Sequence, residues 1–159
     1  MIEDRLAELG IELPPAPAPV ASYVPVRLAP GLAFVSGQLP FDGGSLLYPG
    51  HVGAEVSIEQ AQEGARRAAL QALSAIRDAL GSLEGVTGIV KVEVFVASAP
   101  GFTDQPKVAN GASDVLVEIL GDEGKHARAA VGAAELPLGA SVEVAVVASV
   151  GAPILAGED

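Results

Sequence analysis

The chain has 159 residues, enough for one domain with a hydrophobic core, and half of them are hydrophobic although only 4% are aromatic. Its formal charge of -11, from 20 acidic and 9 basic residues, repels phosphate backbones, so we expect no nucleic-acid partner. The absence of cysteine excludes disulfides, thiolate metal sites and cysteine nucleophiles. No long apolar run occurs, and acids stand near the N-terminus, so we expect no membrane partner and a cytoplasmic location.

Composition divides the chain into three segments. Residues 1–20 contain a predicted helix and a proline-rich connector, residues 21–151 form a single domain, and residues 152–159 are predicted to be an acidic tail. Apolar residues at helical spacing over residues 2–9 are followed by Gly10, a typical helix stop. The prolines that follow predict an extended connector, which is either a linker or a docking motif for a protein partner.

The first part of the domain predicts two strands and a tight turn. Residues 22–27 and 32–36 are rich in strand-forming side chains, and the turn pair Pro30-Gly31 separates them. Asp42-Gly43-Gly44 indicates a second, tight turn. No phosphate-binding motif surrounds these glycines, so we interpret them as turn residues.

The clearest helix signal begins at Ser57. Ser57 and Gln60 form a capping-box pattern, and an apolar stripe of helical period then continues to Leu80, where Gly81 ends the helix. Strict alternation of valines with other residues over residues 90–96 predicts a strand after this helix.

A second helix and two strands complete the pattern. We expect the helix over residues 106–120 and the strands over residues 126–132 and 141–148, paired as a C-terminal hairpin around Leu138. This order of elements predicts an α+β domain with a mixed sheet and both main helices on one face.

Each final strand contains one isolated charge. Arg128 stands among small residues, and its planar guanidinium suits a carboxylate ligand, so we favour an anchoring role over an interface ion pair. Glu143 stands among apolar residues and has two interpretations, an acid/base acting on water or a counter-charge for Arg128 or another base. A hairpin closed at Leu138 would set Arg128 opposite residues 146–148. The two charges would then meet only across a subunit boundary or after a register shift.

Taken together, these motifs resemble the RidA/YjgF family over residues 23–150. The matching positions are Tyr23 in the first strand, Ser36-Gly37-Gln38-Leu39-Pro40 after the second, Asn110 near a helix start, the pair Ala127-Arg128, and Glu143 in the last strand. The resemblance implies a chorismate-mutase-like fold and a homotrimer with ligand sites between subunits. It also implies hydrolytic deamination of a small 2-imino or enamine carboxylic acid to a 2-keto acid and ammonia, without a metal or organic cofactor.

By the same resemblance, Arg128 would anchor the substrate carboxylate and Glu143 would act on the attacking water. The other binding residues would be Tyr23, Ser36, Gly37 and Asn110. Each has a plainer interpretation as well, such as packing for Tyr23 and a helix-start hydrogen bond for Asn110.

The chain also departs from the archetypal pattern. Ala130 stands where many deaminases of the family have cysteine, and Ser113 stands where a tyrosine is usual, which indicates a divergent subgroup. A trimer that binds a metabolite without catalysis, and a protein-interaction module, are therefore alternative functions. Older descriptions of family members as endoribonucleases disagree with the charge of this chain. We expect neither His51 nor His126 to be catalytic.

Overall fold

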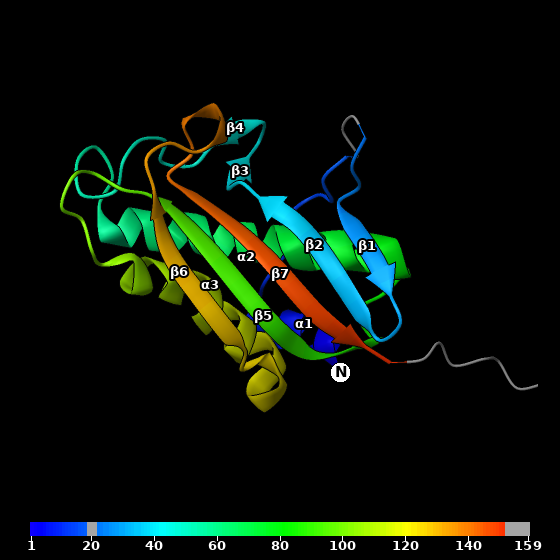
Figure 1. Cartoon of the computed structure of the whole chain (residues 1–159). Helices are drawn as coiled ribbons and strands as arrows, with labels where there is room; N and C mark the ends of the chain where they lie inside the picture. Colours follow the sequence, from blue (N-terminus) through cyan, green and yellow to red (C-terminus); the bar gives the residue numbers. More distant parts are fainter. Residues whose placement is uncertain (19–21, 152–159) are drawn as a thin grey trace, which may run out of the picture.

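Two long helices, α2 (Ile58–Leu80) and α3 (Gln105–Leu120), cover one face of a five-stranded sheet (Figure 1). The computed structural model describes residues 1–18 and 22–151. The other elements are α1 (Ile2–Leu9), β1 (Val26–Ala29), β2 (Leu32–Gln38), β3 (Phe41–Asp42), β4 (Ser45–Leu46), β5 (Val86–Ala97), β6 (Ala127–Ala133), β7 (Val142–Val150) and the 3-10 turns η1 (Gly121–Gly124) and η2 (Pro137–Gly139). The predicted α+β class is confirmed. The end of the proline connector and the acidic tail lie outside the described residues.

The sheet has the strand order β1-β2-β7-β5-β6, and only β5 and β6 are parallel. The predicted C-terminal hairpin is therefore wrong, because β5 lies between β6 and β7 (Figure 1). Helix α3 connects β5 to β6, so these two strands run in the same direction, as in a βαβ unit. The chain then crosses the end of β5 through η2 and returns antiparallel to it as β7.

Strand β1 starts later than the sequence pattern predicts. It begins at Val26 and not at residue 22, after Pro25, which has no N–H group to continue a ladder. Tyr23 precedes the strand, and its side chain is 57% exposed. The tight turn predicted at Asp42-Gly43-Gly44 is confirmed as the link between β3 and β4.

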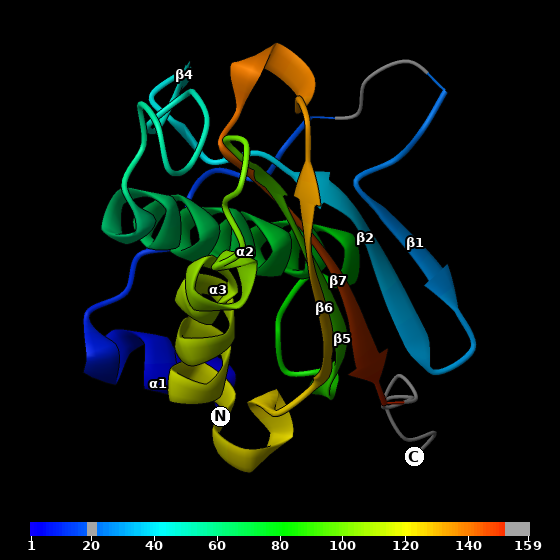
Figure 2. The ribbon, with the colours of Figure 1, turned by 60° about the vertical axis from the view of Figure 1, so that its left-hand side comes forward.

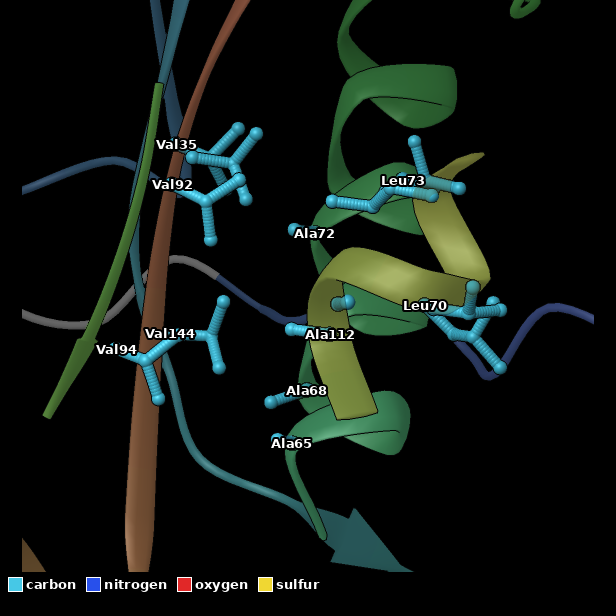
Figure 3. Packing of buried hydrophobic residues seen from close by; sticks show 14 of the residues in the cluster. Val35, Ala65, Ala68, Leu70, Ala72, Leu73, Val92, Val94, Ala112 and Val144 are labelled. Atoms are coloured by element: carbon cyan, nitrogen blue, oxygen red, sulfur yellow. The ribbon is translucent and has the colours of Figure 1, made fainter. Parts of the chain in front are cut away.

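Helix α2 is the centre of the core. Its predicted capping box is confirmed, since the Ser57 hydroxyl accepts from the Gln60 N–H and the Gln60 side chain accepts from the Ser57 N–H. Its alanines lie against the valines of the sheet (Figure 3). Short side chains on the helix let it pack close to the sheet without large aromatic residues, which explains how a chain so poor in aromatic residues fills its interior.

Helices α2 and α3 touch through their backbones at Gly111. A Cβ atom at this position would overlap the carbonyl oxygen of Gln62 and lie 2.7 Å from its Cα atom. The Gln62 side chain also donates a hydrogen bond to the carbonyl of Lys107 on α3, at 2.7 Å. The inner face of α3 is buried, with Val108, Ala112, Val115, Leu116 and Ile119 in the core. Helix α3 is thus fixed firmly to α2.

Helix α1 packs beside α3, on the side away from the sheet (Figure 2). Leu6 is buried in the same hydrophobic core as the rest of the domain, and the Arg5 Nε–H donates to the carbonyl of Glu118 at 3.2 Å. The predicted stop at Gly10 is confirmed by its left-handed conformation. Within residues 1–18 and 22–151, no helix is both long enough and apolar enough to span a membrane.

Candidate functional site

Arg128 is the second residue of β6, the strand at one edge of the sheet. It pairs with Val92 of β5, which in turn pairs with Val146 of β7. Both valines are buried under the helices. Because paired residues share one face of a sheet, the side chain of Arg128 leaves the sheet on the helix side.

The Arg128 guanidinium is held by two neutral acceptors on α3. Its Nη1 donates to Asn110 Oδ1 at 2.9 Å and to Ser113 Oγ at 3.2 Å. Asn110 and Ser113 are three residues apart, so they lie on one face of the helix. Neither Nε nor Nη2 of Arg128 bonds to a described residue, and the side chain is exposed. One edge of the guanidinium is fixed and the other is open.

Arg128 is also distinguished by the absence of an acidic partner. Seven of the nine lysines and arginines form an ion pair with an aspartate or glutamate. Within the described part of the chain, the two exceptions are Arg128 and Arg27. The intrachain counter-charge considered for Arg128 is therefore not found among these residues.

Two residues that we had not placed in the site extend this network. His126 Nε2 lies 2.8 Å from Ser113 Oγ, and His126 Nδ1 lies 2.6 Å from the carbonyl oxygen of Gly124. A sequence signal for this contact exists. His126 and Arg128 are two residues apart, the spacing of side chains on one face of a strand, and Asn110 and Ser113 are three apart, on one face of a helix.

Glu143 lies on the opposite face of the sheet. It pairs with Phe95, and the side chains of both are half-buried on the face without helices. Its carboxylate has no hydrogen bond or ion pair with any described residue, and burial raises its pKa above the ordinary value for glutamate. This group is an unpaired carboxylate with an increased tendency to hold a proton.

Ser36 and Gly37 form the wall beside Glu143. A Cβ atom on Gly37 would overlap Oε1 of Glu143, so the carboxylate lies directly over this glycine. The Ser36 hydroxyl donates to the carbonyl of Val24 at 2.7 Å, and the Ser36 N–H donates to the carbonyl of Pro25 at 2.9 Å. These bonds hold the segment that contains Tyr23 against the end of β2.

The six predicted site residues therefore form two separate groups. Arg128 and Asn110 lie on the helix side, at the free edge of β6. Glu143 and Gly37 lie on the open side with Ser36, and Tyr23 belongs to the adjoining segment. A small ligand cannot touch Arg128 and Glu143 of the same chain, because the sheet separates them.

Other cavities do not overlap these groups. A cavity of about 400 Å³ lies between α1, the start of β5 and the end of α3, and one of about 510 Å³ lies between the proline connector and the end of α2. Across residues 1–18 and 22–151, no group of three or more histidines and acids has a geometry that could hold a metal ion.

Comparison with known proteins identifies the family. Residues 3–150 match the family described as YjgF/chorismate mutase-like, putative endoribonuclease. The chain is 47% identical to Protein TCP17 of Trypanosoma cruzi over 141 residues, and the aligned region covers 88% of each chain.

Two solved structures are similar over almost the whole chain. Atu1372 of Agrobacterium tumefaciens, a protein of unknown function, matches with a TM-score of 0.87 and 43% identity over 94% of this chain and 92% of that one. A putative endoribonuclease of Shewanella oneidensis matches with a TM-score of 0.89 and 31% identity over 94% and 99%. The chain belongs to the YjgF/chorismate mutase-like family, and the resemblance predicted from its motifs is confirmed.

Proposed function

We propose that the protein is a homotrimer that hydrolyses a small 2-imino carboxylic acid to a 2-keto acid and ammonia, at sites shared by two chains. The observation that supports this proposal best is the division of the site residues. A cationic anchor lies on one face of the sheet and an unpaired carboxylate lies on the other, so a complete site needs Arg128 from one chain and Glu143 from the next. The arrangement is symmetric, because each chain offers both halves.

The open face of the sheet suits contact with other copies. Phe34 is 44% exposed and Val131 is 47% exposed, and Phe95 and Val147 lie on the same face. A group of exposed apolar side chains on one sheet face is typical of an interface. In a trimer, this face with Glu143 would be covered by the edge of a neighbouring chain, where Arg128 lies.

Arg128 is suited to bind the carboxylate of the substrate. With Nη1 committed to Asn110 and Ser113, the open edge formed by Nε and Nη2 presents two parallel N–H donors, which match a carboxylate. Asn110 directs its oxygen at the guanidinium, so its NH₂ group is available as a further donor to the ligand.

Glu143 is suited to the proton transfers. Water attacks the carbon of the protonated imine, and Glu143 accepts a proton from this water. Glu143 then gives that proton to the nitrogen of the resulting carbinolamine and returns to its ionised form. The C–N bond breaks, ammonia leaves, and the hydroxyl group loses its proton to solvent to give the keto acid. A carboxylate with a raised pKa is a stronger base than an ordinary glutamate, which favours the first step. Ser36 and Gly37 shape the wall next to the reacting carbon, and Tyr23 closes that side of the pocket.

RNA is an unfavourable substrate for this surface. The net charge is -11, and most basic side chains of the described residues form ion pairs with acids, so this part of the chain offers no positive patch to hold a phosphate backbone. We therefore do not extend the endoribonuclease part of the family description to this chain.

The test is an assay in which 2-iminopropionate or 2-iminobutyrate is generated in situ and keto-acid or ammonia release is followed. Wild type should accelerate the release, Arg128→Ala should abolish the acceleration, and Arg27→Ala, the matched change at the other unpaired arginine, should keep it. A protein that binds 2-oxobutyrate through Arg128 without accelerating hydrolysis would contradict the enzyme and support the metabolite-binding trimer. A stable monomer in sedimentation would contradict the shared site.

A further inference from the structure

The hydrogen bonds that end at Arg128 run in one direction. The carbonyl oxygen of Gly124 has no hydrogen, so His126 must donate to it from Nδ1. In the neutral ring, Nε2 is then an acceptor, and the Ser113 hydroxyl donates to it. The lone pairs of Ser113 Oγ are left to accept from Arg128 Nη1. In these three hydrogen bonds, each donated hydrogen therefore has an acceptor.

We infer that Ser113 and His126 are positioning residues, which hold the Arg128 guanidinium so that its open edge faces the ligand. The inference rests on the proposed function for the identity of that ligand, a small carboxylate. Neither residue touches the reacting atoms. Their effect is on the direction of the arginine donors.

The need for such support follows from the position of Arg128. It stands on an edge strand, its side chain is exposed, and the next residue on the same face of β6 is Ala130, so no bulky neighbour within β6 limits its rotamers. A long side chain in this setting samples several rotamers unless hydrogen bonds select one. Asn110 alone would leave the plane of the guanidinium free to turn about one bond, and Ser113 supplies the second acceptor that fixes it.

His126 contributes by fixing Ser113. A serine hydroxyl rotates freely between neighbouring acceptors, including the backbone of its own helix. The imidazole Nε2 gives the hydroxyl hydrogen one definite acceptor, and the bond from Nδ1 to Gly124 sets the tautomer that makes Nε2 an acceptor. The turn η1 thus helps to determine how Arg128 is presented, although two residues, Lys125 and His126, separate it from β6.

The experiment compares Ser113→Ala and His126→Ala with Ser113→Thr, which keeps the hydroxyl, and with Asp114→Ala. Asp114 is the exposed neighbour on α3 and has no hydrogen bond or ion pair with a described residue, so it is the matched control. Two measurements are made on each full-length variant: the order of the Arg128 side chain from ¹⁵N relaxation of its Nε–H group, and KM and kcat for hydrolysis of 2-iminobutyrate.

We expect Ser113→Ala to make the Arg128 side chain mobile and to raise KM about tenfold, the effect of one hydrogen bond to a charged group, with kcat nearly unchanged. His126→Ala should act in the same direction to a smaller extent. Ser113→Thr should keep the order of the Arg128 side chain and KM close to wild type, and Asp114→Ala should change neither. The ¹⁵N spectrum of wild-type His126 should show the tautomer with hydrogen on Nδ1.

An Arg128 side chain that stays equally ordered in Ser113→Ala would overturn the inference. An equal rise of KM in the Asp114→Ala control would also overturn it, because the effect would then be a general one on α3. The outcome for the proposed function is separate. If wild type does not hydrolyse the imine, that function fails, while the relaxation measurement still decides whether Ser113 and His126 hold Arg128.

Discussion

The carboxylate of Glu143 lies over Gly37 so closely that a Cβ atom on the glycine would overlap its Oε1 atom and lie 2.9 Å from its Cδ atom. The two residues come from neighbouring strands, β2 and β7, at the point where a bulge shifts their register. Gly37 does not have a positive φ, so its backbone would accept another residue. Glycine is required here because of the space that Glu143 occupies.

Replacing Gly37 by alanine should therefore damage the site more than the fold. The end of the flexible Glu143 side chain would move away from the new methyl group, so we expect the midpoint of thermal unfolding to change little. A displaced catalytic group typically reduces the rate by about ten- to a hundredfold, and we expect imine hydrolysis to fall by that amount. Gly85→Ala is the matched control, because its added Cβ would meet only Leu80 Cδ1, at 3.9 Å. A full-rate Gly37→Ala enzyme would contradict the role of Glu143.

Mixed trimers should show that the site is shared by two chains. Arg128→Ala and Glu143→Gln are each expected to be inactive alone. The two variants are unfolded together in equal amounts and refolded. Each site then has a probability of one half of containing an intact arginine and, independently, one half of containing an intact glutamate, so about a quarter of the wild-type activity should return. Refolding each variant separately and then mixing is the control. A site contained in one chain would give no recovery in either case.

The raised pKa of Glu143 gives a pH dependence with a definite sign. In the proposed mechanism Glu143 acts as a base and must be ionised, so kcat/KM should rise with pH through a value above 4.5, the ordinary pKa of glutamate. Glu143→Gln should lose both this pH dependence and the activity. For stability, a raised pKa in the folded state means that the native fold is favoured below the unfolded value and loses this advantage as the pH rises through the folded value. Glu143→Gln should therefore unfold at a higher temperature than wild type at neutral pH, and the difference should disappear below about pH 4.5. An equal difference at both pH values would rule out this explanation.

His51 should make the β6–β7 connection sensitive to pH. Its Nε2 lies 2.9 Å from the carbonyl oxygen of Ala134 and 3.1 Å from Oε1 of Glu135, and these groups raise its pKa above 6.5. The stabilisation is complete below the unfolded value of 6.5 and is lost as the pH rises through the raised folded value. Hydrogen exchange in residues 134–140, corrected for its intrinsic rate, should be slower at about pH 6 than at about pH 8. His51→Ala should remove this difference, and Glu135→Gln should reduce it. Protection that is the same at both pH values in wild type would contradict the role of His51.

The elements of the fold could be predicted from the sequence, but the pairing of its strands could not. The capping box at Ser57, the stop at Gly81 and the alternation in β5 are local signals, and each element is present. The pairing of β5 with β7 joins residues about fifty positions apart, such as Phe95 with Glu143. The periodicity of β6 and β7 does not show that β5, an earlier strand, lies between them. Strands that are consecutive in the sequence were therefore wrongly expected to be neighbours in the sheet.

The charged residues of the candidate site could be predicted from the sequence, but the residues that hold Arg128 in place could not. Arg128 and Glu143 were identifiable because each interrupts a strand of small or apolar residues. Ser113 was noted only as a departure from the family pattern, and His126 was set aside as non-catalytic. Their joint contact depends on how α3 crosses behind β6, which is a property of the packing and not of either segment alone. The opposite orientation of the two charges likewise required the register of three strands.

The close approach of α2 and α3 at Gly111 has an entropic consequence for ligand binding. Asn110 is the neighbour of that glycine, and Ser113 lies two residues further along, so both acceptors of Arg128 belong to the part of α3 that packs directly against the backbone of α2. Acceptors that are already ordered lose little conformational entropy when a ligand binds. More of the free energy of the new contacts then contributes to the affinity. In the proposed trimer the other half of the site would have no such attachment, because Glu143 would come from a second chain. The activity per chain should then decline on dilution, as the proposed trimer dissociates and each anchor is left without its carboxylate.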